Sequence, residues 1–352
     1  MTTSSETKVA LTTLTDELLA NLDARSKDVI QRRFGIKNGR VETLESIGKH
    51  YGVTRERVRQ IEAQAKKSLA NLKDLIRGVT VIFERIFHDN GGIIAQDHIV
   101  ELVRAKFSGE ELSASHILFY LEILPEFTYI TRDTNFAPHW QSASQVNHLA
   151  VKIVQQAQTI LKSAGHPIAQ SELFSSIYQS IGESEAALPP AQIYAALRAS
   201  KHLSLTPFKE WGLSDWAETS PRGVGDKAYA VLRRHNKPEH FTSITALINE
   251  ASFDHKRANA QTVHNELIKD QRFVLVGRGL YGLAEWGYIP GTVADVLESL
   301  LKQSRRPLSR EELIEQVLAQ RQVKKNTILL GLQNEARFVK TAENRYTLKG
   351  NS

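Results

Sequence analysis

The feature that most limits the fold of this chain is a sequence pattern that recurs along most of its length. "HLSLTPFKEWGLSDW" (202–216) aligns with "RFVLVGRGLYGLAEW" (272–286), 70 residues later, with a Gly-Leu pair and a Trp in the same places. "RFVKTAENRYTL" (337–348) repeats the form 65 residues further on, and "FTYITRDTNFAPHW" (127–140) is a fainter first copy. Such a period predicts a row of small units, each burying its apolar face within the array.

Each closing stretch follows the same kind of sequence, as in "VADVLESLLKQSRRPLSREELIEQVLAQ" (293–320). A helix with apolar spacing leads to a turn that contains Pro, and a capped second helix follows. A third helix comes next, such as "ANAQTVHNELIKD" (258–270). Alternating apolar and polar residues in the closing stretch predict a β-hairpin. Three helices and a β-hairpin make a winged helix.

The N-terminal residues have a different pattern, with two short helices joined by a tight break. "TLTDELLANL" (13–22) and "RSKDVIQRRFGI" (25–36) each carry one apolar helical face, and Gly35 supplies the left-handed residue that ends the second helix. Thr43 is an expected N-cap, Gly52 an expected break and Thr54 the next N-cap. This order predicts a helix-turn-helix.

The helix that begins in "GVTRERVRQIEAQAKK" (52–67) has its orientation set by its apolar spacing. The residues expected to face the core are Val58, Ile61, Ala65, Leu69 and Leu72. Side chains able to contact base edges then point outward near the N-terminus of the helix: Arg55, Glu56, Arg59 and Gln60. Lys66 and Lys67 follow where phosphates would pass. The alternative is a solvated helix stabilised by ion pairs.

Residues 11–76 resemble region four of primary bacterial sigma factors, which contacts the upstream, minus-thirty-five promoter element; the run from Val53 to Glu62 carries most of the resemblance, and Ser46 departs from it. The resemblance implies base contacts at the four outward residues and docking on the β-subunit flap of RNA polymerase. It also implies contacts to the DNA backbone from Arg33, Thr43, Leu44 and Arg57. A complete sigma factor carries its promoter-melting region ahead of this domain, and only about ten residues precede the match here. The resemblance therefore implies that this chain does not open a promoter by itself.

Residues 221–350 resemble HARE-type winged helices, the class that includes the RNA polymerase delta subunit, and residues 79–217 do so more weakly. Possible second DNA contacts on the third helices are Gln261, His264, Asn265, Lys324, Lys325 and Asn326. The alternatives are that these residues are solvated or face polymerase. Lys and Arg outnumber Asp and Glu by 15 to 10 in 1–78, 10 to 7 in 221–290 and 11 to 7 in 291–352, but are 9 against 15 in 79–220. The first two copies of the repeat, which lie in the acidic residues 79–220, are therefore expected to contact protein instead of DNA.

The predicted fold class is mainly α, with an N-terminal helix-turn-helix domain followed by tandem winged-helix domains. The expected domains are a disordered 1–10, the helix-turn-helix domain 11–78, and winged helices at 79–143, 144–219, 220–290 and 291–352.

Other chemistry finds little support in the sequence. The motif formed by Gly277, Gly279 and Gly282 has no helix opening at its third glycine, so a hairpin turn is expected instead of a dinucleotide site. His235 and His240 have no third ligand and are expected at the surface. The tryptophans of the closing stretches are expected in cores rather than as base-stacking platforms. We predict neither catalysis nor a cofactor or metal.

Composition agrees with this assignment. The chain has no cysteine and no apolar run of membrane-spanning length, and its start lacks the plan of a secretory signal. The sequence therefore predicts a cytoplasmic, monomeric, non-enzymatic transcription factor that binds promoter DNA and RNA polymerase core. The alternatives are a delta-like polymerase-associated protein with little DNA specificity and a DNA-targeting accessory of a restriction system.

Overall fold

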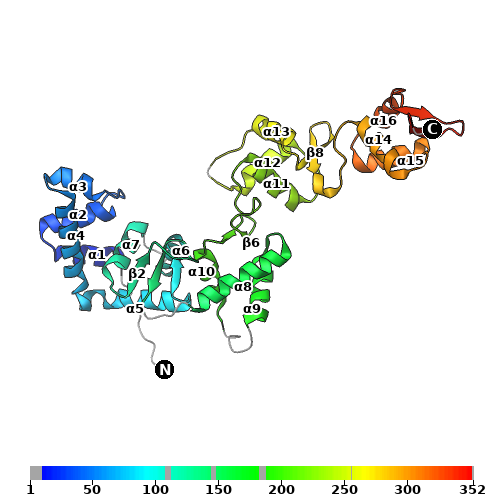
Figure 1. The fold of residues 1–352 in the computed structure, drawn as a ribbon. Coiled ribbons are helices and arrows are strands. Elements are labelled where there is room, and N and C mark those ends of the chain that lie inside the picture. Colours follow the sequence, from blue (N-terminus) through cyan, green and yellow to red (C-terminus); the bar gives the residue numbers. More distant parts are fainter. Residues whose placement is uncertain (1–9, 108–111, 144–147, 182–187, 255, 351–352) are drawn as a thin grey trace. The chain divides into compact units, whose positions relative to one another are not determined.

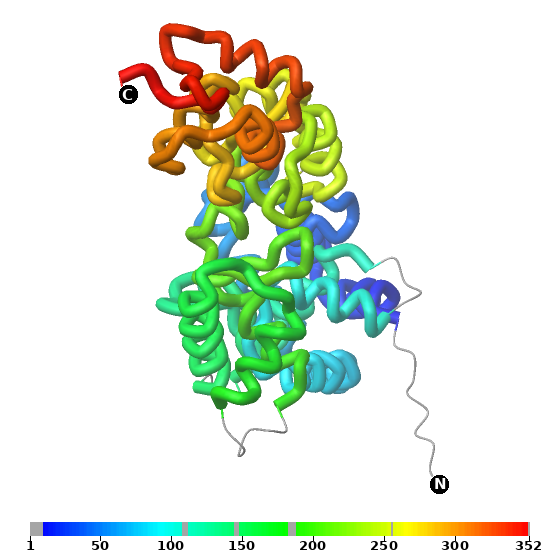
Figure 2. Tube along the Cα trace, turned by 90° about the vertical axis from the view of Figure 1, so that its right-hand side faces the viewer, coloured from blue at the N-terminus to red at the C-terminus, as the bar shows by residue number. Residues whose placement is uncertain are grey.

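The computed structural model describes residues 10–107, 112–143, 148–181, 188–254 and 256–350. The fold is mainly helical with small antiparallel sheets. The chain divides into two compact units, residues 1–204 and 205–352, and each is described by itself. Figures 1 and 2 follow the chain through its elements. Apart from Ala10, the N-terminal residues expected to be disordered lie outside the described residues.

The described residues begin with four helices, and the predicted helix-turn-helix occupies the third and fourth of them (Figure 1). They are α1 (Leu11–Ala20), α2 (Ala24–Phe34), α3 (Leu44–Tyr51) and α4 (Arg55–Ala70). The side chain of Asp23 caps α2 by accepting from the backbone N–H groups of Arg25 and Ser26. The helix ends at Gly35 with φ of 69°, as predicted, because glycine adopts the left-handed conformation without strain.

The rest of the first unit contains two successive copies of one element order: helix, short strand, helix, helix, hairpin. The first copy consists of α5 (Lys73–Asp89), β1 (Ile93–Ala95), α6 (Gln96–Lys106), α7 (Ala114–Ile123), β2 (Phe127–Ile130) and β3 (His139–Ser142). Its antiparallel sheet has the order β1-β3-β2. The second copy consists of α8 (His148–Ala164), β4 (Ile168–Ala169), α9 (Gln170–Ile181), α10 (Pro190–Ala199), β5 (Leu203–Leu205) and β6 (Glu210–Leu213), and continues past residue 204.

The second unit contains two further copies. The third copy consists of α11 (Val224–His235), β7 (Glu239–His240), α12 (Phe241–Ala251), α13 (Ala260–Lys269), β8 (Phe273–Gly277) and β9 (Leu280–Leu283), with the sheet order β7-β9-β8. The fourth consists of α14 (Val293–Ser304), α15 (Arg310–Gln320), α16 (Lys325–Leu332), β10 (Phe338–Lys340) and β11 (Tyr346–Leu348). In the fourth copy a single bridge between Leu308 and Tyr346 takes the place of the first strand.

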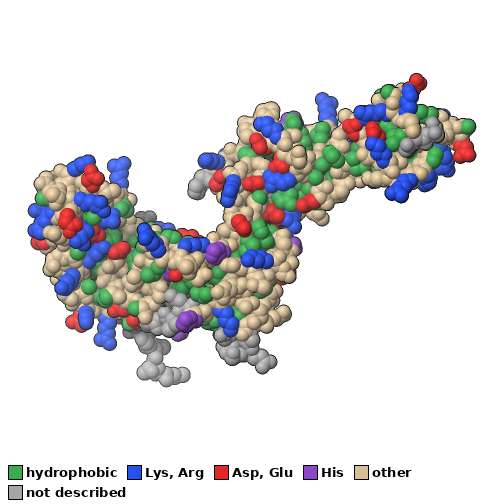
Figure 3. All heavy atoms as spheres, viewed as in Figure 1, with side chains coloured by type: hydrophobic (Ala, Val, Ile, Leu, Met, Phe, Trp, Pro, Cys, Tyr) green, Lys and Arg blue, Asp and Glu red, His purple; other side chains and the backbone are tan. Residues whose placement is uncertain are grey.

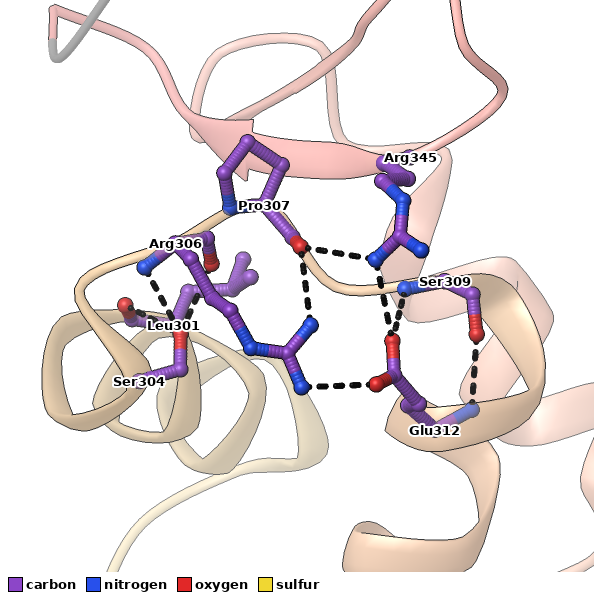
Figure 4. A network of polar contacts seen from close by, with 7 residues as sticks. All are labelled: Leu301, Ser304, Arg306, Pro307, Ser309, Glu312 and Arg345. Atoms are coloured by element: carbon purple, nitrogen blue, oxygen red, sulfur yellow. Dashed lines mark hydrogen bonds and ion pairs between the residues drawn. The ribbon is translucent and has the colours of Figure 1, made fainter.

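A polar network holds that bridge in the fourth copy (Figure 4). Arg306 Nη2 lies 2.8 Å from Glu312 Oε1, and Arg345 Nη1 lies 3.5 Å from Glu312 Oε2. Both guanidinium groups also donate to the carbonyl oxygen of Pro307. Glu312 further accepts from the backbone N–H of Ser309 and completes the cap of α15. One carboxylate therefore fixes the loop, the start of α15 and the hairpin together.

One hydrophobic core extends from the first helix to the last strand of the first copy. Its members run from Leu11 in α1 to Trp140 in β3. The division expected at residue 78 therefore lies inside helix α5 and within this core. Trp211 is 1% exposed and packs in a core as expected, as does Trp140 at 3%. Trp216 and Trp286 are only partly buried, so the expectation is met in part.

The glycine-rich motif lies in the β8–β9 hairpin, as expected. Gly277 ends β8, Gly279 has φ of 67° in the turn, and Gly282 lies in β9 with no α-helix opening there. Among the residues that the structure describes, no group of side chains could hold a metal ion. Within the same ranges, none of the helices has the length and apolar content that crossing a membrane requires.

Candidate nucleic-acid interface

The turn between α3 and α4 is built by caps at both helices. The Oγ1 atom of Thr43 accepts from Ser46 N at 3.1 Å, and that of Thr54 accepts from Arg57 N at 3.2 Å. Gly52 ends α3 with φ of 63°. All three assignments from the sequence are confirmed.

A further glycine allows the two helices to approach. A Cβ atom on Gly48 would lie 2.7 Å from the carbonyl oxygen of Val53, closer than side chains tolerate. Behind this contact Val29, Ile47 and Val58 are fully buried against one another. The small core therefore fixes the angle at which α4 leaves the turn.

The inward face of α4 follows the predicted spacing, with one addition. Val58, Ala65 and Leu69 are buried and Ile61 is partly buried. Leu72 lies beyond the helix end at Ala70 and packs at the edge of the main core. The addition is Glu62, which is 8% exposed although it is charged.

The four side chains predicted to contact bases are all exposed on the first two turns of α4. Arg59 binds Glu56 with two hydrogen bonds, from Nη2 to Oε1 at 2.7 Å and from Nε to Oε2 at 2.9 Å. These bonds hold the pKa of the Glu56 carboxyl below its ordinary value. Gln60 Oε1 accepts from Arg57 Nη1 at 3.2 Å, and Arg55 is exposed on the same end of the helix.

Of the positions expected near a DNA backbone, four are exposed or lie at the start of a helix, and two, Lys66 and Arg33, are paired within the protein. Thr43, Arg57 and Lys67 are exposed, and Leu44 is the first residue of α3, where backbone N–H groups have no partner within the helix. Helix N-termini of this kind bind phosphates. Figure 3 shows Lys and Arg side chains over the region of α2, α3 and α4, with Asp and Glu side chains among them.

Lys66 has a different environment from the one expected for a phosphate contact. Its Nζ lies 2.9 Å from Glu62 Oε1 and 2.8 Å from Glu122 Oε2, and 5.3 Å from the centre of the Phe34 ring. Burial lowers the pKa of Lys66, but the hydrogen bonds to Glu122 and Glu62 outweigh it and the pKa is raised. Two carboxylates therefore compensate the positive charge of Lys66 within the protein, an environment that differs from the one expected of a phosphate contact.

Arg33 is also held within the protein. Its Nη1 donates to the carbonyl oxygen of Glu42 at 3.3 Å, and its Nε lies 3.7 Å from Glu62 Oε2. Its side chain is 36% exposed, although its Nε atom is buried.

A polar cluster that the sequence did not indicate links α2 to α3. Arg32 binds Asp28 at 2.6 Å and Glu42 at 3.1 Å, and the Tyr51 hydroxyl donates to Asp28 at 2.5 Å. These bonds join α2 to the start and the end of α3. Only the Asp28–Arg32 pair has helical spacing, so the other contacts had no sequence signal.

The candidates on the third helix of the third copy lie at the exposed start of α13. Gln261 and Asn265 are exposed and hydrogen-bonded to each other at 3.1 Å. His264 is half-buried, and its ring stacks on Phe241 with centroids 4.5 Å apart. Asn259 caps the helix through its side chain.

The corresponding residues of the fourth copy are at the start of α16. Lys324, Lys325 and Asn326 are exposed, and Lys324 precedes the first helical residue. The structure therefore leaves the polar ends of both α13 and α16 facing solvent.

The third helices of the first two copies are used within the first unit. Helix α7 packs against α2 and α4, and α10 packs against β1. Arg198 on α10 pairs with Asp97 and lies 3.5 Å from Glu101, while Ser200, just after α10, forms a β-bridge with Phe136. Neither helix presents a free face like that of α13.

Comparison with known proteins identifies the helix-turn-helix segment. Residues 18–71 match the family described as Sigma-70, region 4. The segment is 52% identical over 54 residues to RNA polymerase sigma factor SigA of Lactococcus lactis subsp. cremoris, covering 15% of each chain. It is 48% identical over 62 residues to RNA polymerase principal sigma factor HrdD of Streptomyces coelicolor, covering 18% of each. The chain thus spans less than a fifth of the length of these two relatives, and what it shares with them is a sigma-70 region 4 domain at residues 18–71.

Proposed function

We propose that this chain is a sequence-specific DNA-binding protein that acts at transcription initiation. The observation that carries the proposal is the exposure of Arg55, Glu56, Arg59 and Gln60 together on the first two turns of α4. Their type suits the major groove: Arg binds guanine O6 and N7, Gln binds adenine, and Glu accepts from cytosine N4. The match of residues 18–71 to the Sigma-70, region 4 family supports DNA recognition by this segment.

Backbone contacts complete the proposed interface. Thr43 and the N-terminus of α3 would bind one phosphate group of the DNA backbone. The exposed side chains of Arg57 and Lys67 would supply positive charge to the same interface. Arg33 contributes its exposed part. The excess of 15 Lys and Arg over 10 Asp and Glu in residues 1–78 draws the segment to a polyanion.

The four copies are proposed to be winged helices of the HARE type. Helix, strand, helix, helix and hairpin, with the first strand beside the last, support this assignment in the first and third copies. Exposure of α13 and α16 supports DNA contacts from the third and fourth copies. Because α7 and α10 pack within the first unit, we propose that the third helices of the first two copies hold that unit together.

RNA polymerase core is the proposed protein partner, since the matched relatives are named as RNA polymerase sigma factors. We further propose that the protein is a cytoplasmic monomer without catalytic activity. Its role would be to recruit polymerase or to modulate transcription initiation.

The proposal is tested by comparing Arg59→Ala with Lys67→Ala on selected and random duplexes. Loss of a base contact in Arg59→Ala should cost about 1–3 kcal/mol on the selected duplex and relax the preference at one base pair. Loss of a phosphate contact in Lys67→Ala should weaken all duplexes alike and lower the salt slope by about one unit. Identical behaviour of the two variants on both duplexes would contradict base recognition by α4.

A polymerase-associated protein with little DNA specificity is the second candidate. It is favoured by the mutual pairing of Arg59 and Glu56, which is also what a solvated helix face shows. Full retention of polymerase binding and of any DNA binding in an Arg55→Ala/Arg59→Ala variant would support it.

A further inference from the structure

A helix from the first repeat copy fills a groove in the region 4 domain. Phe119 of α7 meets Phe34 of α2 edge to face, with ring centroids 5.5 Å apart. The hydroxyl of Tyr120 donates to the carbonyl oxygen of Leu11 at 3.0 Å and accepts from Thr15 Oγ1 at 3.1 Å. Contacts from α7 therefore reach both α1 and α2.

An ion pair closes the same contact at the surface. Lys66 of α4 binds Glu122 of α7 at 2.8 Å, 56 residues away in sequence. The groove walls and α7 belong to one buried cluster, in which Ile30 and Leu69 are fully buried and Ala65 is 2% exposed. The residues of α1, α2 and α4 thus form a helix-binding groove, and α7 is the helix that it holds.

The walls of the groove on α2 and α4 belong to the matched segment, whereas most of α1 and the occupant lie outside it. Ile30, Ala65 and Leu69 lie within residues 18–71, and α7 (Ala114–Ile123) lies outside that range. A region 4 domain without the following repeat would present this apolar groove to solvent or to a helix of another protein.

With α7 in place, little apolar surface is left on the domain. Among the described residues 10–72, the large hydrophobic side chain with substantial exposure is Val41, at 64%. A tightly bound partner helix needs buried apolar anchors at the centre of its interface. A partner can find them here only if α7 leaves.

Departure of α7 would also dismantle the first copy. Phe119, Tyr120 and Leu121 are fully buried, and the cluster that holds them includes Phe87 of α5 and Trp140 of β3. The helix thus packs against the region 4 helices and against the rest of the first copy at once, and Glu122 remains exposed.

We propose that α7 permanently occupies the groove formed by α1, α2 and α4, so that this chain contacts RNA polymerase outside that groove. The proposal rests on the proposed function for its choice of partner. Polymerase would then meet this protein through the repeats or through polar surfaces of the domain, while α4 remains free to bind DNA.

Locking α7 in place tests the proposal in the full chain. The sequence has no cysteine, so a bismaleimide links only the pair introduced by Lys66→Cys and Glu122→Cys. A matched control is Glu298→Cys with Lys302→Cys, which replaces an exposed ion pair within α14. Binding of RNA polymerase core and of a selected duplex is measured before and after crosslinking.

We expect the crosslink between positions 66 and 122 to leave polymerase binding unchanged, as the control crosslink does. A loss of about tenfold or more in polymerase affinity, confined to the 66–122 crosslink, would show that α7 must leave and would overturn the proposal.

Hydrogen exchange of the unmodified chain gives an independent measurement. Residues 114–123 should be as protected as the buried face of α5, with or without polymerase core. Faster exchange of α7 than of α5, or its deprotection on adding polymerase, would overturn the proposal. If polymerase binds neither crosslinked nor free chain, the polymerase part of the proposed function fails, and hydrogen exchange alone decides whether α7 stays.

Discussion

At the scale of single residues, charge pairing and backbone conformation explain positions that apolar spacing does not, such as Glu62, Gly48 and Gly279. Glu62 lies on the buried face of α4 because Lys66 and Arg33 approach it from two helices. Gly48 and Gly279 lie where a side chain would collide with backbone or with a ring. Apolar spacing placed Val58 and Leu69 correctly, but it carries no information on a charged residue whose partners are distant in sequence.

Glu312 provides a prediction on pH dependence. Its hydrogen bond from Arg306, followed by that from the Ser309 backbone, lowers its pKa to about 2 from an ordinary value of 4.5. A depressed carboxyl pKa contributes stability above the ordinary value, and that stability is lost as pH falls from about 4.5 toward 2. Glu312→Gln should therefore lower the melting temperature of the fourth copy at pH 7, with a difference from the parent chain that shrinks toward pH 2. A difference that is constant with pH would contradict the network of Figure 4.

Gly279 provides a prediction on backbone strain. Its φ is 67°, and an added Cβ would lie 2.6 Å from His240 Nε2. Gly279→Ala should destabilise the third copy by about 2 kcal/mol or more, because left-handed strain of about 1–2 kcal/mol is joined by a collision. Gly287→Ala is the control: φ is 83° there, but nothing lies within 4 Å of the added Cβ, so strain alone applies. Equal losses in urea unfolding would show that the collision is relieved at no cost.

At the scale of elements, caps and breaks were visible in the sequence and very short strands were not. Thr43, Gly52 and Thr54 mark the helix-turn-helix because each changes the local backbone through its own chemistry. Strands β1 (Ile93–Ala95) and β7 (Glu239–His240) were missed, because segments of three and two residues show no alternation. Their pairing with β3 and β9 depends on the hairpin that follows far along the chain.

Thr54 provides a prediction on the capping of α4. Thr54→Ala removes the side-chain acceptor for Arg57 N and should cost about 1 kcal/mol of helix stability. Fraying of the first turn should then weaken binding to the selected duplex, because that turn carries Arg55 and Glu56. Thr54→Ser keeps the acceptor and should restore both stability and binding. Failure of Ser to restore them would show that the cap is not the cause.

At the scale of the whole molecule, one core joins what the sequence separates. The helix-turn-helix domain and the first repeat copy share the cluster that contains Ile30, Phe83 and Phe119. Loops and repeats suggested independent domains, but α5 runs through the expected boundary and α7 packs on both sides. The orientation of α4 relative to the first repeat is therefore fixed by packing and not by a linker.

Phe119 provides a prediction on cooperativity. Phe119→Ala should cost about 3–5 kcal/mol, because a fully buried aromatic ring is replaced by a cavity. Hydrogen exchange should rise together in α2, α4 and α5, since one core supports all three. Ile328→Ala in α16 is a control whose effect should be confined to the fourth copy, where Ile328 is fully buried. Loss of protection in α5 alone would contradict a shared core.

The sequence by itself determined the local features of this protein: the region 4 helix-turn-helix, the outward face of α4, the repeating order of helices and hairpins, and the turn at Gly279. These follow from residue types within a few positions of one another. Only the tertiary structure decided that Lys66 binds Glu122, that α7 fills the groove of the region 4 domain, and that the first two copies turn their third helices inward. Those contacts join residues 56 to 109 positions apart, and the periodicity of the sequence does not predict which two faces pack together.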